Sequence, residues 1–334
     1  SGEAATQEIV DARVSAVKSK TFASLDARFE ETEQDIATHK TDYTSAHGGT
    51  YHKNILHNWD FRNPVNQRGQ SSYTGTAYSI DRWKLSKATA SLDVQSGNVK
   101  LTFVGDGDMR QYVENYQQYK GKTITFSVEL VSPTVENVAM GIDDGVSFTV
   151  YGLKNKTAGI YSVTRTIDNN ATKLYVRIFG NQLGLTNSVE ISRVKLELGS
   201  VSTLANDPPA DYGEQLALCQ RYFVAVNAFR IAYATPAFAI ASSNTTARAL
   251  LHLPVPMRLA NPTVTMKGSN WVLTQTTSSA GLSVTAMTKA SNESAANVGA
   301  IMLELTSSGL TTGSAYRLEA KADATCDIWI SAEI

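Results

Sequence analysis

Apolar side chains in the N-terminal segment, up to Ile36, recur at the spacing of a helix. Five positions are spaced alternately three and four residues apart: Phe22, Leu25, Phe29, Thr32 and Ile36. This is the spacing of a coiled-coil seam, and either Thr21 or Ser24 can cap the start of such a helix. Two heptads are marginal in isolation, because a short helix barely offsets the cost of its nucleation. The helix therefore needs a partner, either the later domains or other copies of the chain, and we favour other copies.

The helical pattern stops after Ile36. Residues 40–53 hold Gly48-Gly49 and no periodicity, which indicates a linker. From there to about Ala205 the pattern is one of short strands, as in Ser91–Val104, where apolar and polar residues alternate around a turn. Further candidate strands are Lys122–Val131, Ser147–Tyr151, Tyr161–Ile167, Lys173–Phe179 and Val189–Leu198. Gly, Asn and Asp separate them, so an antiparallel sandwich is expected.

A second β-rich region follows a break at Asn206–Asp211 (NDPPAD). Glu214–Phe223 first shows the spacing of a short helix. Candidate strands then lie at Leu250–Val255, Thr263–Lys267, Trp271–Thr276, Leu282–Met287, Ala300–Leu305, Tyr316–Ala320 and Cys326–Ser331. The chain is therefore expected to be mainly β, with a helical segment and linker over 1–53, a sandwich over 54–205 and a second sandwich over 206–334.

Charge excludes some classes of partner. Lys and Arg number 30 against 31 Asp and Glu, a formal net charge of −1, so a general nucleic-acid binder is not expected. Charged residues make up only 18%, and Ser, Thr, Asn and Gln must supply the rest of the polar surface. No run of residues approaches the ~18 apolar positions of a membrane span. No basic and apolar leader opens the chain, so we expect no secretory signal peptide.

The common catalytic motifs are not recognisable in the sequence. It holds no nucleophile elbow, HExxH, CxxC or EF-hand pattern, and we expect no catalytic residue. The pairs Asp143-Asp144 and Asp106/Asp108 have the composition of a glycosidase carboxylate pair. Each pair stands beside Gly in a turn, so turn formation is the favoured reading. Either pair, or Asp60, is also a candidate ligand of a structural calcium ion; no other cofactor is expected.

Four histidines lie close together in and after the linker: His39, His47, His52 and His57. Around a symmetry axis such side chains can bind a metal ion. The alternative is a polar linker that happens to contain histidines, and we favour this alternative.

Aromatic residues provide the clearest candidate binding chemistry. Tyr112, Tyr116 and Tyr119 lie within eight residues (QYVENYQQYK), while Trp59 and Trp271 have polar neighbours such as Asn270. Flat rings beside amide and guanidinium groups suit sugar recognition, because a ring covers C–H groups and amides bind hydroxyls. Core packing is the alternative for each ring, and we favour it for Trp83. The candidate carbohydrate-binding residues are Trp271, Asn270, Trp59, Tyr112, Tyr116 and Tyr119.

Several strings resemble parts of one class of protein. Asn54–Arg68 (NILHNWDFRNPVNQR) and Ser79–Trp83 (SIDRW) resemble the opening of a domain common in phage and prophage tail fibres, whose layout is similar to the jelly-roll carbohydrate-binding modules of glycosidases. The sequences of Arg110–Phe126 and Val189–Gly199 resemble later parts of the same domain. Further strings resemble the C-terminal and N-terminal parts of such fibres and of upper-baseplate proteins: Glu214–Phe223, Leu253–Thr265, Glu8–Arg13 and Thr21–Arg28. A small polar residue is expected at Trp59, which suggests that this tryptophan faces a ligand.

This resemblance implies a homotrimeric receptor-binding protein of a tail fibre or baseplate, located in the virion. A coiled coil would set the axis, a jelly roll would follow, and the N-terminus would join other tail or baseplate proteins. The host ligand would be a cell-surface glycan, and no insertion into a membrane is implied. The alternatives are a polysaccharide depolymerase with an attached binding module, which lacks a convincing catalytic pair, and a stand-alone carbohydrate-binding module, which leaves the charged helix unexplained.

We expect the receptor contact at the C-terminal domain, because the helix at the N-terminus would lie on the axis. Four of its loops are polar and lightly charged: Ser242–Arg248, Lys267–Trp271, Gln275–Gly281 and Lys289–Asn297. Such loops suit a neutral glycan, since they offer hydrogen bonds without a strong field. Trp271 is either a stacking face for a sugar or the first core residue of its strand.

Overall fold

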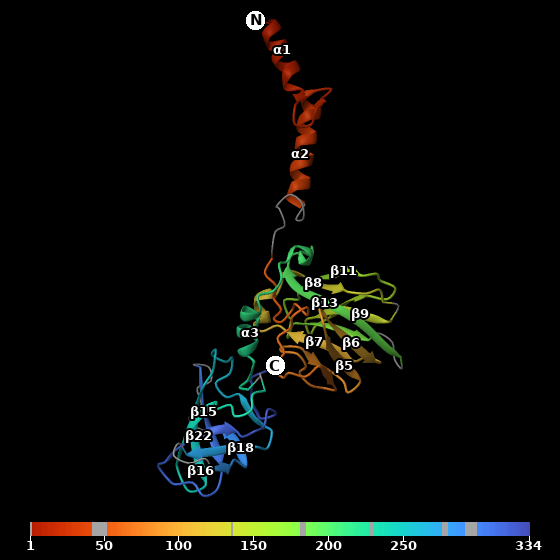
Figure 1. Ribbon diagram of the computed structural model, residues 1–334. Coiled ribbons are helices and arrows are strands. Elements are labelled where there is room, and N and C mark those ends of the chain that lie inside the picture. The colour runs from red at the N-terminus through yellow and green to blue at the C-terminus, as the bar shows by residue number, and fades with distance from the viewer. Residues whose placement is uncertain are drawn as a thin grey trace. The chain divides into compact units, whose positions relative to one another are not determined.

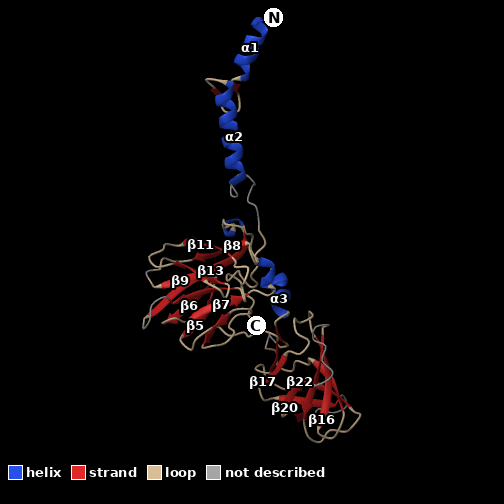
Figure 2. Cartoon of the chain, turned by 180° about the vertical axis from the view of Figure 1, so that it is seen from behind, coloured by secondary structure: helices blue, strands red, loops and turns tan. Residues whose placement is uncertain are grey.

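The computed structural model describes residues 2–41, 52–134, 136–180, 185–227, 230–275, 280–290 and 299–334 (Figure 1). Two compact units divide the chain, one made of Ser1–His52 with Ala205–Asp207 and the other of Lys53–Leu204 with Pro208–Ile334. Strands, red in Figure 2, are the main regular secondary structure of the second unit. The expected mainly β fold is confirmed. No helix among the described residues has the length and apolar character needed to cross a membrane.

The first unit contains two helices, α1 (Gly2–Ala12) and α2 (Leu25–Thr41), and a small hairpin of β1 (Val14–Ser15) and β2 (Lys20–Thr21). The predicted helix is therefore confirmed, and the Ser24 hydroxyl accepts a hydrogen bond from the Ala27 N–H at 3.0 Å as its cap. The seam prediction is wrong at Phe22. That residue precedes α2 and is buried, and its N–H donates to the Arg13 carbonyl at 2.9 Å.

Of the rest of the predicted seam, Leu25 is half-buried, whereas Phe29, Thr32 and Ile36 are exposed in the single chain. The side chains of Phe29 and Ile36 are 64% and 49% exposed. Exposed apolar side chains on a charged helix are what an association between helices would cover. Association itself stays a prediction.

The second unit opens with a sandwich of two antiparallel sheets. The six-stranded sheet has the order β11-β8-β13-β6-β5-β3: Gly159–Thr166, Thr123–Leu130, Thr186–Leu198, Asn98–Val104, Ala90–Gln95 and Ser72–Thr74. The five-stranded sheet has the order β10-β9-β12-β7-β4: Phe148–Gly152, Val138–Asp143, Tyr175–Gly180, Asp108–Tyr112 and Lys84–Leu85. From β6 to β9 the chain changes sheet at each step, and it does so again at each step from β10 to β13. This alternation builds the expected jelly roll.

Alternation along the strands produces the core of this sandwich. In β5 and β6 the apolar side chains point inward at every second residue, and Gly97 (φ 85°) turns the chain between them. Trp83 is fully buried in the same core, as we expected. Its ring packs edge-on against the Phe61 ring, with the two ring centroids 5.4 Å apart.

A short helix leads into the second sandwich. The helix α3 (Tyr212–Gln220) is capped by Asp211, whose Oδ1 accepts from the Glu214 N–H at 2.7 Å. The prediction that this helix extends to Phe223 is wrong, because Phe223 begins strand β14 and pairs with Ser331. The three-stranded sheet has the order β14-β23-β17: Phe223–Ala225, Asp327–Ser331 and Thr263–Lys267. The seven-stranded sheet has the order β19-β18-β22-β15-β16-β21-β20: Gly281–Ser283, Trp271–Gln275, Ala315–Ala320, Ala237–Ala241, Thr246–His252, Ala300–Thr306 and Ala286–Lys289.

Buried polar side chains after the linker connect the two sandwiches. Asn58 is the centre of this network. Its Nδ2 donates to the carbonyls of Val65 and Asp81, both at 2.8 Å, and its N–H donates to the Gln215 side chain at 2.7 Å. Gln67 donates to the Phe223 carbonyl at 2.8 Å. Satisfied in this way, buried amides fix the position of one sandwich against the other.

Arg68 is the charged centre of the same junction. Its Nη2 lies 2.6 Å from the Glu333 carboxylate and its Nη1 lies 3.6 Å from that of Asp81, and all three side chains are buried. The guanidinium also stacks on the Phe223 ring, 3.8 Å from its centroid. Burial raises the pKa of Asp81 to about 6 and of Glu333 to about 7, and the positive charge of Arg68 opposes both shifts.

Replacing Arg68 with Met should lower the free energy of unfolding by about 3–5 kcal/mol, because Asp81 and Glu333 would lose their cation inside the protein. The matched control is Arg248→Met, whose ion pair with Glu304 is exposed, for which we expect a loss of less than about 1 kcal/mol. Urea unfolding of both variants measures the difference. Equal effects would show that the Arg68 ion pairs do not hold the junction.

Candidate functional site

The outer face of the five-stranded jelly-roll sheet gathers aromatic side chains. Along its central strands Met109, Ile178 and Met140 point into the core, so the residues between them face outward. The strand register places four outward residues in one row: Tyr112, Tyr175, Asp143 and Phe148. The rings of Tyr112 and Tyr175 lie 5.0 Å apart. Three aromatic rings with a carboxylate among them therefore form one row of this face.

Two arginines form the neighbouring row. Arg110 and Arg177 are register partners, and their guanidinium carbons lie 5.0 Å from the Tyr175 ring centroid and 3.9 Å from that of Phe148, respectively. Asp108 is buried beside them. It accepts from Arg110 Nε at 2.7 Å and lies 3.7 Å from Arg177 Nη1. Rings and carboxylate thus hold both cations in place, while the Nε–H of Arg177 has no hydrogen-bond partner among the described residues.

Asp143 completes the polar edge of the row. It accepts a hydrogen bond from the Tyr175 hydroxyl at 2.6 Å, and Lys173 Nζ lies 3.8 Å from its other oxygen. Burial and the nearby carboxylate raise the pKa of Tyr175, which keeps the phenol protonated as a donor. The side chains of Arg110 and Asp143 remain 20% and 16% exposed. A ligand on this face can reach both an N–H donor and a carboxylate acceptor.

We call these residues the sheet-face site: Tyr112, Tyr175, Phe148, Arg110, Arg177 and Asp143. Tyr175 is only 4% exposed and supports the row from within it, whereas Tyr112 and Phe148 are partly exposed. The rings of Tyr112 and Phe148 can cover the C–H groups of a ligand, the guanidinium groups donate hydrogen bonds, and the carboxylate accepts them. A ligand with alternating C–H and hydroxyl groups matches this arrangement best.

Tyr112 belongs to this site, but the other two predicted tyrosines do not share its row. Tyr116 and Tyr119 lie in the short helix η1 (Tyr116–Tyr119) and pack partly against the jelly-roll core. Burial raises the pKa of Tyr119. Their participation in binding stays a prediction.

Both tryptophans predicted to face a ligand are buried instead. Trp271 is fully buried, with its Nε1–H donated to the Lys267 carbonyl at 2.8 Å, and Trp59 is 5% exposed within the jelly-roll core. Neither ring has a free face, so the predicted ligand-facing role is wrong for both. Asn270 is exposed and donates to Asp323 at 3.1 Å. Of the four predicted receptor loops, residues 276–279 and 291–297 lie outside the described residues.

The acidic pairs have structural partners. Asp144 is buried, and its oxygens accept from the N–H groups of Val146 and Ser147 at 3.0 and 2.9 Å and from Arg165 at 2.7 Å. Turn formation is confirmed for Asp143-Asp144, where Asp143 also accepts from the Gly145 N–H at 2.8 Å. It is wrong for Asp108, which begins strand β7 and is paired with Arg110. Asp60 is likewise bonded to Arg62 at 2.7 Å.

In the part of the chain that the structure describes, no three His, Cys, Asp or Glu side chains are grouped to hold a metal ion. His57 is buried beside the Tyr222 ring, and burial, together with the positive charges of Arg82 and Arg221, lowers its pKa to about 3. His47 and the side chain of His39 lie outside the described residues.

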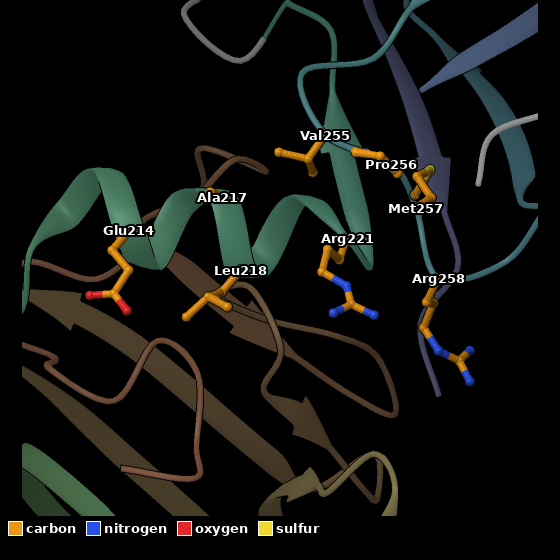
Figure 3. A pocket seen from close by; sticks show the side chains of 8 residues that line it. All are labelled: Glu214, Ala217, Leu218, Arg221, Val255, Pro256, Met257 and Arg258. Carbon is orange, nitrogen blue, oxygen red and sulfur yellow. The ribbon is translucent and has the colours of Figure 1, made fainter. Parts of the chain in front are cut away.

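A hollow of about 550 Å³ lies beside α3 (Figure 3). Its lining comes from two of the strings that carry the resemblance: Glu214, Ala217, Leu218, Arg221, Val255, Pro256, Met257 and Arg258. Figure 3 shows the two guanidinium groups at the end away from Glu214. Both arginines are held there by one carboxylate, since Glu114 lies 3.6 Å from Arg221 and 3.5 Å from Arg258. This hollow therefore has a structural arginine pair at its end.

The sequence held only part of the signal for the sheet-face site. Alternation in Lys173–Phe179 indicates that Tyr175 and Arg177 share one face of a strand. The antiparallel pairing of β12 with β7 and β9 brings Arg110 and Asp143 beside them. Such a pairing between distant segments has no local sequence signal.

No protein-family model and no curated protein matches this sequence. Among solved structures, the chain is similar to a CBM4 structure at 16% identity and a TM-score of 0.29, covering 42% of this chain and 98% of that one. It is also similar to TmCBM61 in complex with β-1,4-galactotriose, at 14% sequence identity and a TM-score of 0.28. That match covers 44% of this chain and 99% of that one. The CBM22-1–CBM22-2 tandem domain of Xyn10C from Paenibacillus barcinonensis is similar at 10% sequence identity and a TM-score of 0.29. That match covers 85% of this chain and 91% of that one. Because the TM-scores of these matches are all below 0.5, they allow no conclusion about the ligand of this chain.

Proposed function

We propose that this chain is a non-catalytic saccharide-binding protein that acts in several copies. The partly exposed rings of Tyr112 and Phe148, in one row beside Arg110 and Arg177, are the observation that carries the proposal. A pyranose ring placed on this row would lay its C–H groups on the Tyr112 or the Phe148 ring. Its hydroxyls would accept from the guanidinium groups, which the buried Asp108 and the rings already hold in position.

The exposed face of α2 supports association of several copies. Phe29 and Ile36 are largely exposed there, and a single short helix cannot cover them. Three copies joined along this face would present three sheet-face sites, which raises the avidity for a repetitive glycan without any new contact. The proposed assembly is therefore a homotrimer.

We further propose that the trimer serves attachment of a phage tail to a host cell-surface glycan. The strings that resemble tail-fibre and baseplate proteins support this role. In that arrangement the N-terminal helices join other tail or baseplate proteins of the virion. The protein would bind glycan without cleaving it, since the Asp144 oxygens are already engaged by Val146, Ser147 and Arg165.

Replacing Tyr112 with Ala should weaken saccharide binding about tenfold or more, because an aromatic anchor contributes roughly 1–2 kcal/mol. The matched control is Tyr161→Ala, which removes a half-buried tyrosine of the opposite sheet. A glycan array identifies the ligand, and calorimetry on the intact chain measures both variants. The glycan should be recovered uncleaved. Unchanged affinity in Tyr112→Ala would remove the sheet-face site from the proposal, and glycan cleavage would contradict the non-catalytic role.

Replacing Leu25 and Phe29 with Asp should dissociate the trimer, because each substitution places a charge inside a packed seam at a cost of several kcal/mol. The control is Glu33→Gln, which changes a charge away from the seam. Light scattering should give about three times the monomer mass for the unaltered chain and for the control. A monomeric unaltered chain at micromolar concentration contradicts the trimer, and a trimer that survives the double substitution contradicts the role of α2.

A further inference from the structure

A groove of about 470 Å³ lies between the two sandwiches. The jelly roll supplies Arg68 and Tyr78 to its lining, and the C-terminal domain supplies Lys267, Trp329 and Glu333. Hydroxyl-bearing side chains also line it: Ser72, Thr74, Thr265 and Ser331. The groove thus combines an aromatic face, charged groups and many small hydrogen-bonding groups, and it is separate from the sheet-face site.

The walls of this groove are fixed by bonds across the junction. The Tyr78 hydroxyl donates to the Ile334 carbonyl, Arg68 is paired with Glu333 at 2.6 Å, and Gln67 donates to the Phe223 carbonyl at 2.8 Å. Because bonds from both sides hold the walls, the groove exists before any ligand binds. Preformed sites avoid the entropic cost of ordering side chains on binding.

Two charged groups in the groove have unused bonding capacity. Glu333 accepts from Arg68 through one oxygen, while its other oxygen, Oε1, is buried and has no hydrogen-bond partner in the part of the chain that the structure describes. Lys267 Nζ lies 4.2 Å from the centroid of the Trp329 ring and is paired with no carboxylate in the described part of the chain. A buried polar atom without a partner is costly, so a ligand that bonds Glu333 would gain from it.

We propose that the groove is a second ligand site, which binds a saccharide unit against the Trp329 ring and bonds its hydroxyls to Glu333 and Lys267. A hydroxyl donates to a carboxylate and accepts from an ammonium group, so one kind of ligand group satisfies both. The positive charges of Arg68 and Lys267 in the lining are balanced by Glu333 and by Asp81, the buried carboxylate beside Arg68. This balance favours a neutral sugar over a strongly charged ligand.

The second site stands independently of the sheet-face site. The two sites share no residue, and either one can bind in the absence of the other. In a repetitive glycan, two sites on one chain would be engaged together and would slow dissociation.

Trp329 makes this proposal directly measurable. The other three tryptophans, Trp59, Trp83 and Trp271, are buried, whereas Trp329 is half-exposed. Acrylamide should therefore quench Trp329 selectively. The probes are neutral di- to tetrasaccharides of glucose, galactose, mannose and N-acetylglucosamine at millimolar concentration. At least one of them should protect Trp329 from quenching in the intact chain.

Lys267→Met, which keeps the length of the apolar stem, should weaken this protection roughly three- to tenfold. Lys321→Met, an exposed lysine outside the groove lining, is the matched control and should leave protection unchanged. Tyr112→Ala should also leave it unchanged, which separates this site from the sheet-face site. Protection by none of the neutral sugars would overturn the proposal, as would protection that Lys267→Met leaves intact or that Tyr112→Ala abolishes.

Discussion

A guanidinium group buried between two carboxyl groups joins the two sandwiches of this protein. Arg68 reaches Glu333 and Asp81, which come from different parts of the fold, and stacks on the Phe223 ring. Burial makes each carboxylate costly, as the raised pKa values of Asp81 and Glu333 show. One cation shared by both reduces that cost only while the sandwiches remain together. The groove, whose lining includes Arg68 and Glu333, depends on this arrangement.

The sheet-face site depends on a different constraint, the pleat of the sheet. The same strands that send Met109, Ile178 and Met140 into the core turn the residues between them outward. A binding row on such a face inherits the rigidity of the core behind it, because each side chain is fixed by its own strand. Asp108, on the same face of the sheet, adds to this rigidity by pairing with Arg110 and Arg177. The aromatic rings are consequently positioned without any loop having to order on binding.

Local patterns in the sequence were sufficient to predict much of the fold. The seam from Leu25 to Ile36, the alternation of Ser91–Val104 and the break after Ala205 correspond to α2, to the β5–β6 hairpin and to the start of the second sandwich. Burial of single residues was less predictable. Trp271 stands among polar neighbours, yet it is fully buried, because its strand lies inside a seven-stranded sheet that sequence spacing does not reveal. The candidate site was equally difficult to predict, because Tyr112 and Phe148 come into one row only through the register of strands that are distant in sequence.

The most direct test of saccharide binding at the sheet face is a crystal structure of the intact chain with an oligosaccharide that it binds in solution. The sheet-face site should hold a sugar ring, with its C–H groups on Tyr112 or Phe148 and hydroxyls within hydrogen-bonding distance of Arg110, Arg177 or Asp143. Sugar density confined to the loops Ser242–Arg248 and Lys267–Trp271, with the sheet face empty, would contradict this account.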